Sequence, residues 1–245
     1  MTAAYALTHC ANPHPHRPPP HTHVGYWNIR GLAHPIRNLL AYLEVPYTED
    51  VYELGGAPEY SREGWTSVKP TLPLEFPNLP YLFDGDVKLT QSCTILRYLA
   101  RTHGAGKGLY EGTPAALAEV DLVLDQTVDM RTAVTRTAYG AMPFDTLRDT
   151  VLPAFLVGFE ALFTRDGRTF AAGGSLTIAD FALHEVLEEI VDMYADLAPT
   201  TPAFATYPAI AAYVARFEAV PAIAAYRARP DYIARPYNNK QAAWK

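Results

Sequence analysis

The sequence predicts an α/β unit followed by an all-helical unit, and three observations support this fold class. Strand-like runs lie between residues 24 and 90 and alternate with two amphipathic helical patterns. After Gly112 the strand signals stop, and four long helical segments follow. The 245 residues are also enough for two modest domains with a real core.

Residues 1–23 are predicted to be a disordered extension that precedes both units. They hold five of the eight histidines and five closely spaced prolines, and no acidic residue precedes Glu44. Such a segment cannot bury enough apolar surface to offset the entropy lost on ordering. Its histidines could bind a divalent metal weakly, although histidine tracts often stay in solvent.

The first unit, residues 24–106, has the element order β-α-β followed by β-β-α. The runs "VGYWN" and "YTEDVYE" have strand composition, and between them Pro35 starts a helix with an i, i+3, i+4, i+7 apolar stripe. A Gly-, Pro- and Ser-rich loop follows the second strand. The run "LPYLFDGDVKLT" predicts two strands joined by a hairpin turn at residues 84–86. Ser92 is expected to cap a last helix that ends near Gly104.

The second unit, residues 114–235, follows a linker over residues 107–113 and precedes a C-terminal tail over residues 236–245. The predicted helices cover residues 114–138, 144–164, 177–194 and 208–228. The third has the clearest start, because Thr177 and Asp180 form the S/T-x-x-D pattern of a capping box.

Composition argues against several classes of protein. The formal net charge of −6 disfavours general nucleic-acid binding, which needs a basic face. The sequence contains no run of 18 apolar residues, so no membrane-spanning helix is expected. The two cysteines, Cys10 and Cys93, do not suggest a disulfide framework, so a reducing, cytoplasmic location is expected. His34, His103 and His184 have no metal-ligand set around them in the sequence, and we expect neither a metal nor a resident cofactor at the site.

The order of the first unit resembles the thioredoxin superfamily. Redox members of that superfamily place Cys-x-x-Cys after the first strand, whereas this chain has the cysteine-free stretch Tyr26–Arg30 there, so dithiol exchange is not expected. Pro80, in "NLPYL", stands where this fold tends to use a cis-proline. A cis bond there would leave the preceding backbone free to pair with an extended peptide.

Several blocks together resemble the mu class of glutathione S-transferases. These are "GYWNIRGLAHPIR", "GAPEYSREGW", "FPNLPYL", "KLTQS", "ARFEA" and the "AAW" near the C-terminus, in matching order and spacing. The resemblance covers about residues 24–245. It implies a thioredoxin-like domain that binds glutathione and a helical domain that holds most of the electrophile pocket, in a homodimer.

The resemblance also implies individual roles. Tyr26 matches the catalytic tyrosine, whose hydroxyl hydrogen-bonds the glutathione sulfur, and Asp129 matches an aspartate that reaches the γ-glutamyl ammonium in the neighbouring subunit. The implied glutathione-binding residues are Tyr26, Trp27, Leu32, Arg62, Trp65, Lys69, Asn78, Leu79, Pro80, Gln91, Ser92 and Asp129. The implied electrophile-binding residues are Ile29, Leu32, Thr135, Tyr139 and Tyr232. The implied dimer-interface residues are Phe76, inserted into the partner subunit, and Arg97, near the dimer axis.

Charge complementarity agrees with these roles. Glutathione carries two carboxylates and one ammonium at neutral pH. Arg62 and Lys69 can meet one carboxylate, and the start of the helix after Gln91 can meet the other, because helix N-termini favour anions. Taken singly, each residue has a plainer interpretation as a core residue, a helix cap or a solvated charge, and only the whole set favours the site.

Three departures from the mu pattern concern the electrophile preference. Met130 and Thr135 stand where the class often has asparagine and a larger aliphatic residue, and Tyr232 is interpreted as replacing a phenylalanine of the pocket wall. The resulting hypothesis is an enzyme that conjugates glutathione to small hydrophobic electrophiles. The alternatives are a non-catalytic carrier or structural protein on the same scaffold, as lens crystallins of this superfamily are, and a glutathione-dependent isomerase.

Overall fold

A four-stranded sheet forms the centre of the first domain. The computed structural model describes residues 22–165 and 168–245, so residues 1–21 of the expected extension over residues 1–23 lie outside the described residues. The strands are β1 Thr22–Trp27, β2 Tyr47–Tyr52, β3 Tyr81–Asp84 and β4 Val87–Thr90. Their order is β2-β1-β3-β4, with β1 parallel to β2 and antiparallel to β3, and β3 antiparallel to β4. This topology confirms the predicted thioredoxin-like fold.

Strand β1 begins two residues earlier than predicted. Thr22 and His23 pair with β2 on one side and with β3 on the other, so neighbouring strands flank their backbone on both sides. The Thr22 hydroxyl also donates to Asp84 at 2.9 Å. These two residues therefore belong to the sheet and not to the extension.

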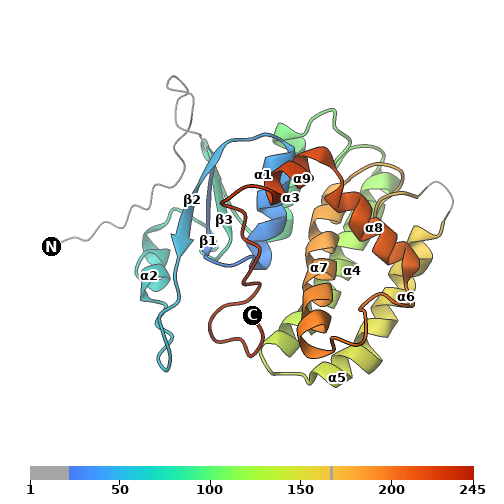
Figure 1. Cartoon of the computed structure of the whole chain (residues 1–245). Helices are drawn as coiled ribbons and strands as arrows, with labels where there is room; N and C mark the ends of the chain where they lie inside the picture. The colour runs from blue at the N-terminus through green and yellow to red at the C-terminus, as the bar shows by residue number, and fades with distance from the viewer. Residues whose placement is uncertain (1–21, 166–167) are drawn as a thin grey trace.

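Helices cover both faces of the sheet (Figure 1). α1 (His34–Tyr42) and α3 (Ser92–His103) lie between the sheet and the helical domain, and the short α2 (Glu63–Thr66) lies on the opposite side. The apolar stripe of α1 is fully buried, as its spacing predicts. The hairpin between β3 and β4 turns at Gly85 with φ of +59°, a conformation that favours glycine.

The start of α3 differs from the prediction. Ser92 is the first residue of the helix, and the N-cap is Gln91, which has a φ of +71° and makes no capping hydrogen bond with its side chain. Ser92 is therefore not the N-cap. The backbone N–H groups of the first turn have no side-chain cap, which leaves this end of the helix ready to bind an anion.

The described residues of the second domain are mainly helical, with one isolated β-bridge between Phe170 and Gly173. Its elements are α4 Pro114–Ala138, α5 Phe144–Thr146, a π-helical turn Leu147–Val151, α6 Leu152–Phe163, α7 Ile178–Leu197, α8 Pro208–Glu218 and α9 Pro221–Arg227. Two 3₁₀ turns, Gly31–Ala33 and Lys69–Thr71, complete the first domain. The long α4 has the predicted bounds, and α7 extends three residues beyond its predicted end.

Two predicted helices are interrupted. The segment predicted over residues 144–164 contains the π-helical turn between α5 and α6, where an extra residue enters the helical repeat. The segment predicted over residues 208–228 breaks into α8 and α9 before Pro221, which has no N–H to continue the helix. Apolar periodicity alone does not reveal either break.

Helix α7 runs through the middle of the molecule and packs on α1, α4 and α8 (Figure 1). Its capping box is formed as predicted, with Asp180 accepting from the backbone N–H and the hydroxyl of Thr177 at 2.7 and 2.9 Å. One hydrophobic core extends from β1 and α1 into the helical domain. The two domains therefore hold a fixed relation, and the site between them is built on rigid elements.

Among residues 22–165 and 168–245, no single helix has the length and apolarity of a membrane span. Only α8 and α9 taken together reach that length and apolarity, and the chain bends by 78° between these two helices.

Candidate functional site

Tyr26 lies at the end of β1, where the strand enters a tight loop. Its side chain is only 6% exposed, and its hydroxyl oxygen accepts a hydrogen bond from the backbone N–H of Leu32 at 2.9 Å. The loop approaches the phenol so closely that a Cβ on Gly31 would lie 2.5 Å from the Tyr26 oxygen. Gly31 also has a φ of +44°, so both space and backbone conformation require glycine there.

The environment of Tyr26 keeps its phenol protonated. Burial raises the pKa of the phenol, and this effect outweighs the opposing influence of the Leu32 N–H and of the positive charges on Arg131 and Arg37. Because Leu32 donates to the oxygen, the hydroxyl proton stays available for an acceptor outside the protein. The site can therefore offer one hydrogen-bond donor at neutral pH.

Two arginines and the C-terminal tail hold the loop after Tyr26. Arg37 donates to the carbonyl of Ile29 at 2.8 Å. The N–H groups of Arg30 and Gly31 donate to carbonyls of the tail at 2.8 and 3.1 Å. The buried Arg30 side chain also pairs with Glu185 on α7 at 2.6 Å. The loop is thus positioned by both domains.

The segment before β3 contains the predicted cis peptide bond between Leu79 and Pro80. Asn78 is exposed, and its side-chain oxygen accepts a hydrogen bond from the N–H of Leu79 at 2.9 Å. A peptide that pairs with this N–H, as the sequence analysis expects, must displace the asparagine side chain.

The predicted basic end of the site combines a buried ring with exposed charges. Trp65 on α2 is buried, and its ring centroid lies 5.2 Å from that of Tyr52. Arg62 and Lys69 are exposed on either side of it in the chain. The Arg62 guanidinium donates to the side chain of Gln241 at 2.8 Å, so the C-terminal tail reaches this end of the site.

The start of α3 is the end of the site that is predicted to bind the second carboxylate of the ligand. Gln91 is exposed and Ser92 half-buried there. Asp129 is exposed on α4 and forms no salt bridge among the residues that the structure describes. Its predicted role is in a neighbouring subunit, which is consistent with an unpaired, exposed carboxylate.

A small cavity between the domains adjoins this end of the site. Residues of the loop after Tyr26 and of α1, α3, α4 and α7 line this cavity. The lining residues are Leu32, Pro35, Ser92, Cys93, Leu96, Thr127, Val128, Arg131, Ala182 and Val186. The cavity volume of about 30 Å³ is far below that of the clefts that hold drug-sized ligands.

The predicted electrophile residues lie mainly between Tyr26 and the end of α4. Ile29 is buried, Leu32 is exposed and Thr135 is half-buried. Tyr139 follows the last residue of α4 and is 38% exposed, and its hydroxyl accepts from the N–H of Asn239 at 3.2 Å. Burial raises the pKa of the Tyr139 phenol, so this second hydroxyl also stays protonated.

Tyr232 lies against the start of α1, and its place in the electrophile pocket stays a prediction. Its ring packs edge-on against His34, with centroids 5.1 Å apart, and its hydroxyl accepts from Arg227 at 3.1 Å. The chain turns back after α9, which keeps Tyr232 against the start of α1. The tail reaches Tyr139 seven residues later, at Asn239. Asn239 is therefore a tail residue beside Tyr139 of the predicted pocket.

The predicted interface residues have different surroundings. Phe76 is 72% exposed, an unusual environment for a phenylalanine in a single chain. Arg97 forms a salt bridge with Asp121 at 2.8 Å and lies near the ring of Tyr110. The arginine is thus already engaged within its own chain.

Sequence reasoning missed three contributors to the site: Arg131, Asn239 and Gln241. Arg131 could have been found, because helical spacing places it on one face of α4 with Thr127 and Thr135. The two tail residues carry no local signal, since their place depends on how the chain after α9 folds back.

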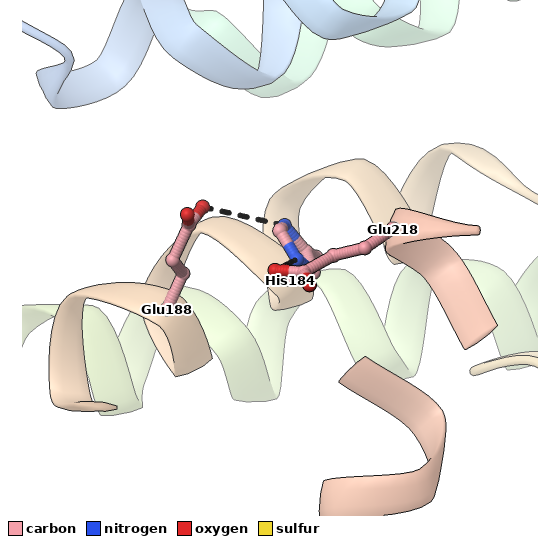
Figure 2. A group of neighbouring side chains, drawn as sticks. All are labelled: His184, Glu188 and Glu218. Carbon is pink, nitrogen blue, oxygen red and sulfur yellow. Dashed lines mark hydrogen bonds and ion pairs between the residues drawn. The ribbon is translucent and has the colours of Figure 1, made fainter. Parts of the chain in front are cut away.

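A second polar cluster lies on the other side of α7 (Figure 2). His184 sits between Glu188 on its own helix, at 3.8 Å, and Glu218 at the end of α8, at 3.3 Å. The sequence analysis saw no such set around a histidine, because Glu218 is distant in the chain. Three ligands of these types could hold a metal ion. Arg227 already bridges both carboxylates at 2.9 and 3.2 Å, so a guanidinium fills the position of a cation.

The comparisons with known proteins agree across both domains. A model of the glutathione S-transferase N-terminal domain matches residues 22–101, and a model of the C-terminal domain matches residues 128–230. Glutathione S-transferase Mu 4 of Mus musculus is 38% identical over 223 residues, covering 90% of this chain and 97% of the relative. Glutathione S-transferase Mu 3 of Homo sapiens is also 38% identical, over 226 residues that cover 90% and 94% of the two chains.

Solved structures give the same result. The crystal structure of the glutathione S-transferase Blo t 8 aligns with a TM-score of 0.76 and 34% identity, covering 90% of this chain and 98% of the other. A Pi-class glutathione S-transferase of Onchocerca volvulus aligns with a TM-score of 0.74 and 27% identity, covering 91% and 99%. With this fold, these matched domains and these relatives, the chain belongs to the glutathione S-transferase family and resembles its Mu class.

Proposed function

We propose that the protein binds glutathione and transfers its sulfur to small hydrophobic electrophiles. The observation that carries this proposal is the buried, protonated phenol of Tyr26, whose oxygen is occupied by the Leu32 N–H and whose proton remains free to donate. A single donor beside a bound thiol stabilises the thiolate over the thiol. The thiolate is the nucleophilic form of sulfur.

The described geometry supports one orientation of the tripeptide. Arg62 and Lys69 would meet the glycine carboxylate, and the uncapped start of α3 at Gln91 and Ser92 would meet the γ-glutamyl carboxylate. The backbone beside cis-Pro80 would pair with the central residue. This order places the thiol near Tyr26.

The reaction follows from the two phenols. The glutathione thiol loses its proton to solvent, the sulfur lone pair attacks an electrophilic carbon, and a halide leaves or a carbon–oxygen bond of an epoxide opens. Tyr139 is placed to protonate the oxygen that an epoxide releases, because its phenol stays protonated and lies half-exposed on the helical side of the site. Glutathione is the co-substrate, and the proposed steps need no resident metal or cofactor.

The assembly that fits these residues is a homodimer. Phe76 is 72% exposed, and covering it would contribute about 1.5–3 kcal/mol. Asp129 is an exposed carboxylate with no intrachain salt bridge in the described residues, as a ligand to a neighbouring site would be. We also propose a reducing, cytoplasmic location, which suits the free thiol of Cys93.

A turnover assay with a panel of electrophiles tests the function. An aryl halide, an epoxide and an α,β-unsaturated carbonyl are each combined with glutathione and the wild-type protein or Tyr26→Phe. We expect conjugation with at least one class and a loss of at least tenfold at neutral pH in Tyr26→Phe. Tyr207→Phe, a ring-preserving change near α8, is the matched control and should keep full turnover. Glutathione binding without any turnover would instead support a carrier or structural role.

A further inference from the structure

A chain of hydrogen bonds crosses three strands on the α2 side of the sheet. The His23 ring on β1 bonds Asp50 on β2 at 2.6 Å. The same carboxylate oxygen accepts from the hydroxyl of Tyr81 on β3, also at 2.6 Å. The Tyr81 hydroxyl in turn bonds that of Tyr52 on β2 at 2.9 Å. We call His23, Asp50, Tyr81 and Tyr52 the cross-strand chain.

Gly25 makes this arrangement possible. It pairs with Asp50 on one side and with Tyr81 on the other, so the Tyr81 side chain must pass over it to reach β2. A Cβ at Gly25 would lie 2.0 Å from the Tyr81 ring. The absence of a side chain at Gly25 therefore lets a phenol from β3 reach across β1 to two partners on β2.

The direction of each bond follows from the available protons. Hydrogen bonds from His23 and Tyr81 lower the pKa of Asp50 despite its burial, so the carboxylate is ionised at neutral pH and acts as an acceptor. Tyr81 has one hydroxyl proton and gives it to Asp50. Tyr52 must then donate to Tyr81, which fixes the rotation of the Tyr52 hydroxyl and the position of its ring.

The far end of the cross-strand chain touches two tryptophans. The Tyr52 ring lies edge-on to Trp65, with centroids 5.2 Å apart, and edge-on to Trp27, with centroids 6.3 Å apart. Trp65 also stacks on Tyr81 at 6.3 Å. Edge-to-face contacts of this kind restrict where a ring can lie.

We propose that Asp50 and Tyr81 are positioning residues that hold the Trp27 and Trp65 rings in place for glutathione. This inference rests on the proposed role of these two tryptophans as glutathione ligands. It assigns a function to Asp50 and Tyr81, for which the sequence analysis gives no role. The cross-strand chain acts on the binding of the tripeptide, whereas Tyr26 acts on its sulfur.

The separation of these two roles provides the test. Tyr81→Phe keeps the ring over Gly25 and removes both hydrogen bonds, and Asp50→Ala removes the acceptor. In both variants we expect the KM for glutathione and its dissociation constant to rise about five- to tenfold. The kcat and the pKa of the bound thiol should stay near the wild-type values, because Tyr26 and Leu32 are untouched.

Asp86→Ala, at an exposed hairpin position of the same domain, is the matched control and should leave the KM unchanged. Folded Tyr81→Phe and Asp50→Ala variants with wild-type KM and dissociation constant would overturn the inference and leave the proposed function intact. A wild-type protein that binds no glutathione in calorimetry would overturn the proposed function itself. If Asp50→Ala does not fold, Tyr81→Phe alone decides, since it changes no packing volume beyond one oxygen.

Discussion

At the scale of single residues, the site depends on the hydrogen bonds of a phenol: a backbone N–H donates to its oxygen, and its own proton stays available to donate. Leu32 uses the acceptor side of Tyr26, so the donor side remains for a ligand. Tyr139 has a similar arrangement, because the N–H of Asn239 donates a hydrogen bond to its hydroxyl oxygen. Both phenols have a pKa raised by burial, so both are donors at neutral pH.

Tyr139→Phe should separate the electrophile step from glutathione binding. We expect epoxide turnover to fall about 10²-fold, the lower end of the range for general acid catalysis. The glutathione dissociation constant should not change, because Tyr139 lies on the electrophile side of the site. Steady-state kinetics with an epoxide and an aryl halide check this, since aryl substitution releases no oxygen to protonate. A weakened glutathione affinity in this variant would contradict the assignment.

Residues with local signals could be predicted from the sequence, and residues placed by distant contacts could not. The position of Tyr26 at a strand end follows from nearby sequence, and the cis bond before Pro80 follows from the resemblance to the thioredoxin superfamily; the structure has both. The contact of Tyr232 with His34 has no local signal, because the path of the tail after α9 depends on contacts with α1. Asn239 and Gln241 were missed for the same reason.

At the scale of elements, the start of α7 shows how one carboxylate can organise a helix end. Asp180 accepts from Thr177 at its own helix start and from the N–H of Ala171 at 2.7 Å. The capping box was predictable because both of its residues are close in the sequence. The bond to Ala171 was not, because it depends on how the preceding loop folds.

Asp180→Ala should therefore cost more stability than the loss of an ordinary cap. Burial raises the pKa of this carboxyl to about 6, although its hydrogen bonds oppose the rise. At neutral pH, the cost of burying the charge therefore offsets part of the stabilisation that the hydrogen bonds contribute. We expect the free energy of unfolding to fall by about 1–3 kcal/mol. Urea denaturation measures it, with Thr113→Ala at the exposed start of α4 as the control. An equal or smaller loss than in the control would disagree with this account.

The interrupted helices show the limit of periodicity at this scale. Residues 144–164 and 208–228 both have continuous apolar patterns, yet a π-helical turn divides one and Pro221 divides the other. Pro221 could have been recognised as a break from its chemistry. The π-helical turn has no comparable signal, because it packs against α4, which lies outside the turn's own sequence pattern.

At the scale of the whole molecule, a network of charges joins the loop after Tyr26 to the helical domain. Arg30, beside the loop that contacts Tyr26, pairs with Glu185 and Glu188 on α7, and Glu188 pairs with Arg227 on α9. Removing Arg30 would leave the buried Glu185 carboxylate without its guanidinium partner, which is costly. The network thus ties the position of Tyr26 to the packing of both domains.

This network should make stability depend on acid pH. Burial opposes the ionisation of Glu188, but the charge of Arg30 and the hydrogen bond from it hold the pKa at about 2, below the 4.5 of the unfolded chain. The resulting stabilisation is complete above pH 4.5 and is lost as the pH falls towards 2. Unfolding free energies measured between pH 5 and 2 should fall less steeply in Glu188→Gln than in the wild type. A Glu59→Gln control should keep the wild-type slope, and identical slopes in all three proteins would count against the network.

The proposed dimer should depend on Phe76. Phe76→Ser should shift the protein towards monomer in sedimentation velocity and weaken glutathione binding, because Asp129 could no longer complete a neighbouring site. Val157→Ser is the matched control, since Val157 is 61% exposed on α6. A wild-type protein that sediments as a fully active monomer would contradict the proposed dimer.

The central claim is that Tyr26 lowers the pKa of the glutathione thiol by hydrogen-bonding the thiolate. A free thiol has a pKa of about 8.5, and a hydrogen bond to a charged group contributes roughly 1.5–3 kcal/mol, or about one to two pKa units. Ultraviolet difference titration of the thiolate in the binary complex measures this pKa directly. The account predicts a value of about 6.5–7.5 in the wild type and a value near 8.5 in Tyr26→Phe. Equal thiol pKa values in the two proteins would contradict it and leave Tyr26 as a core residue.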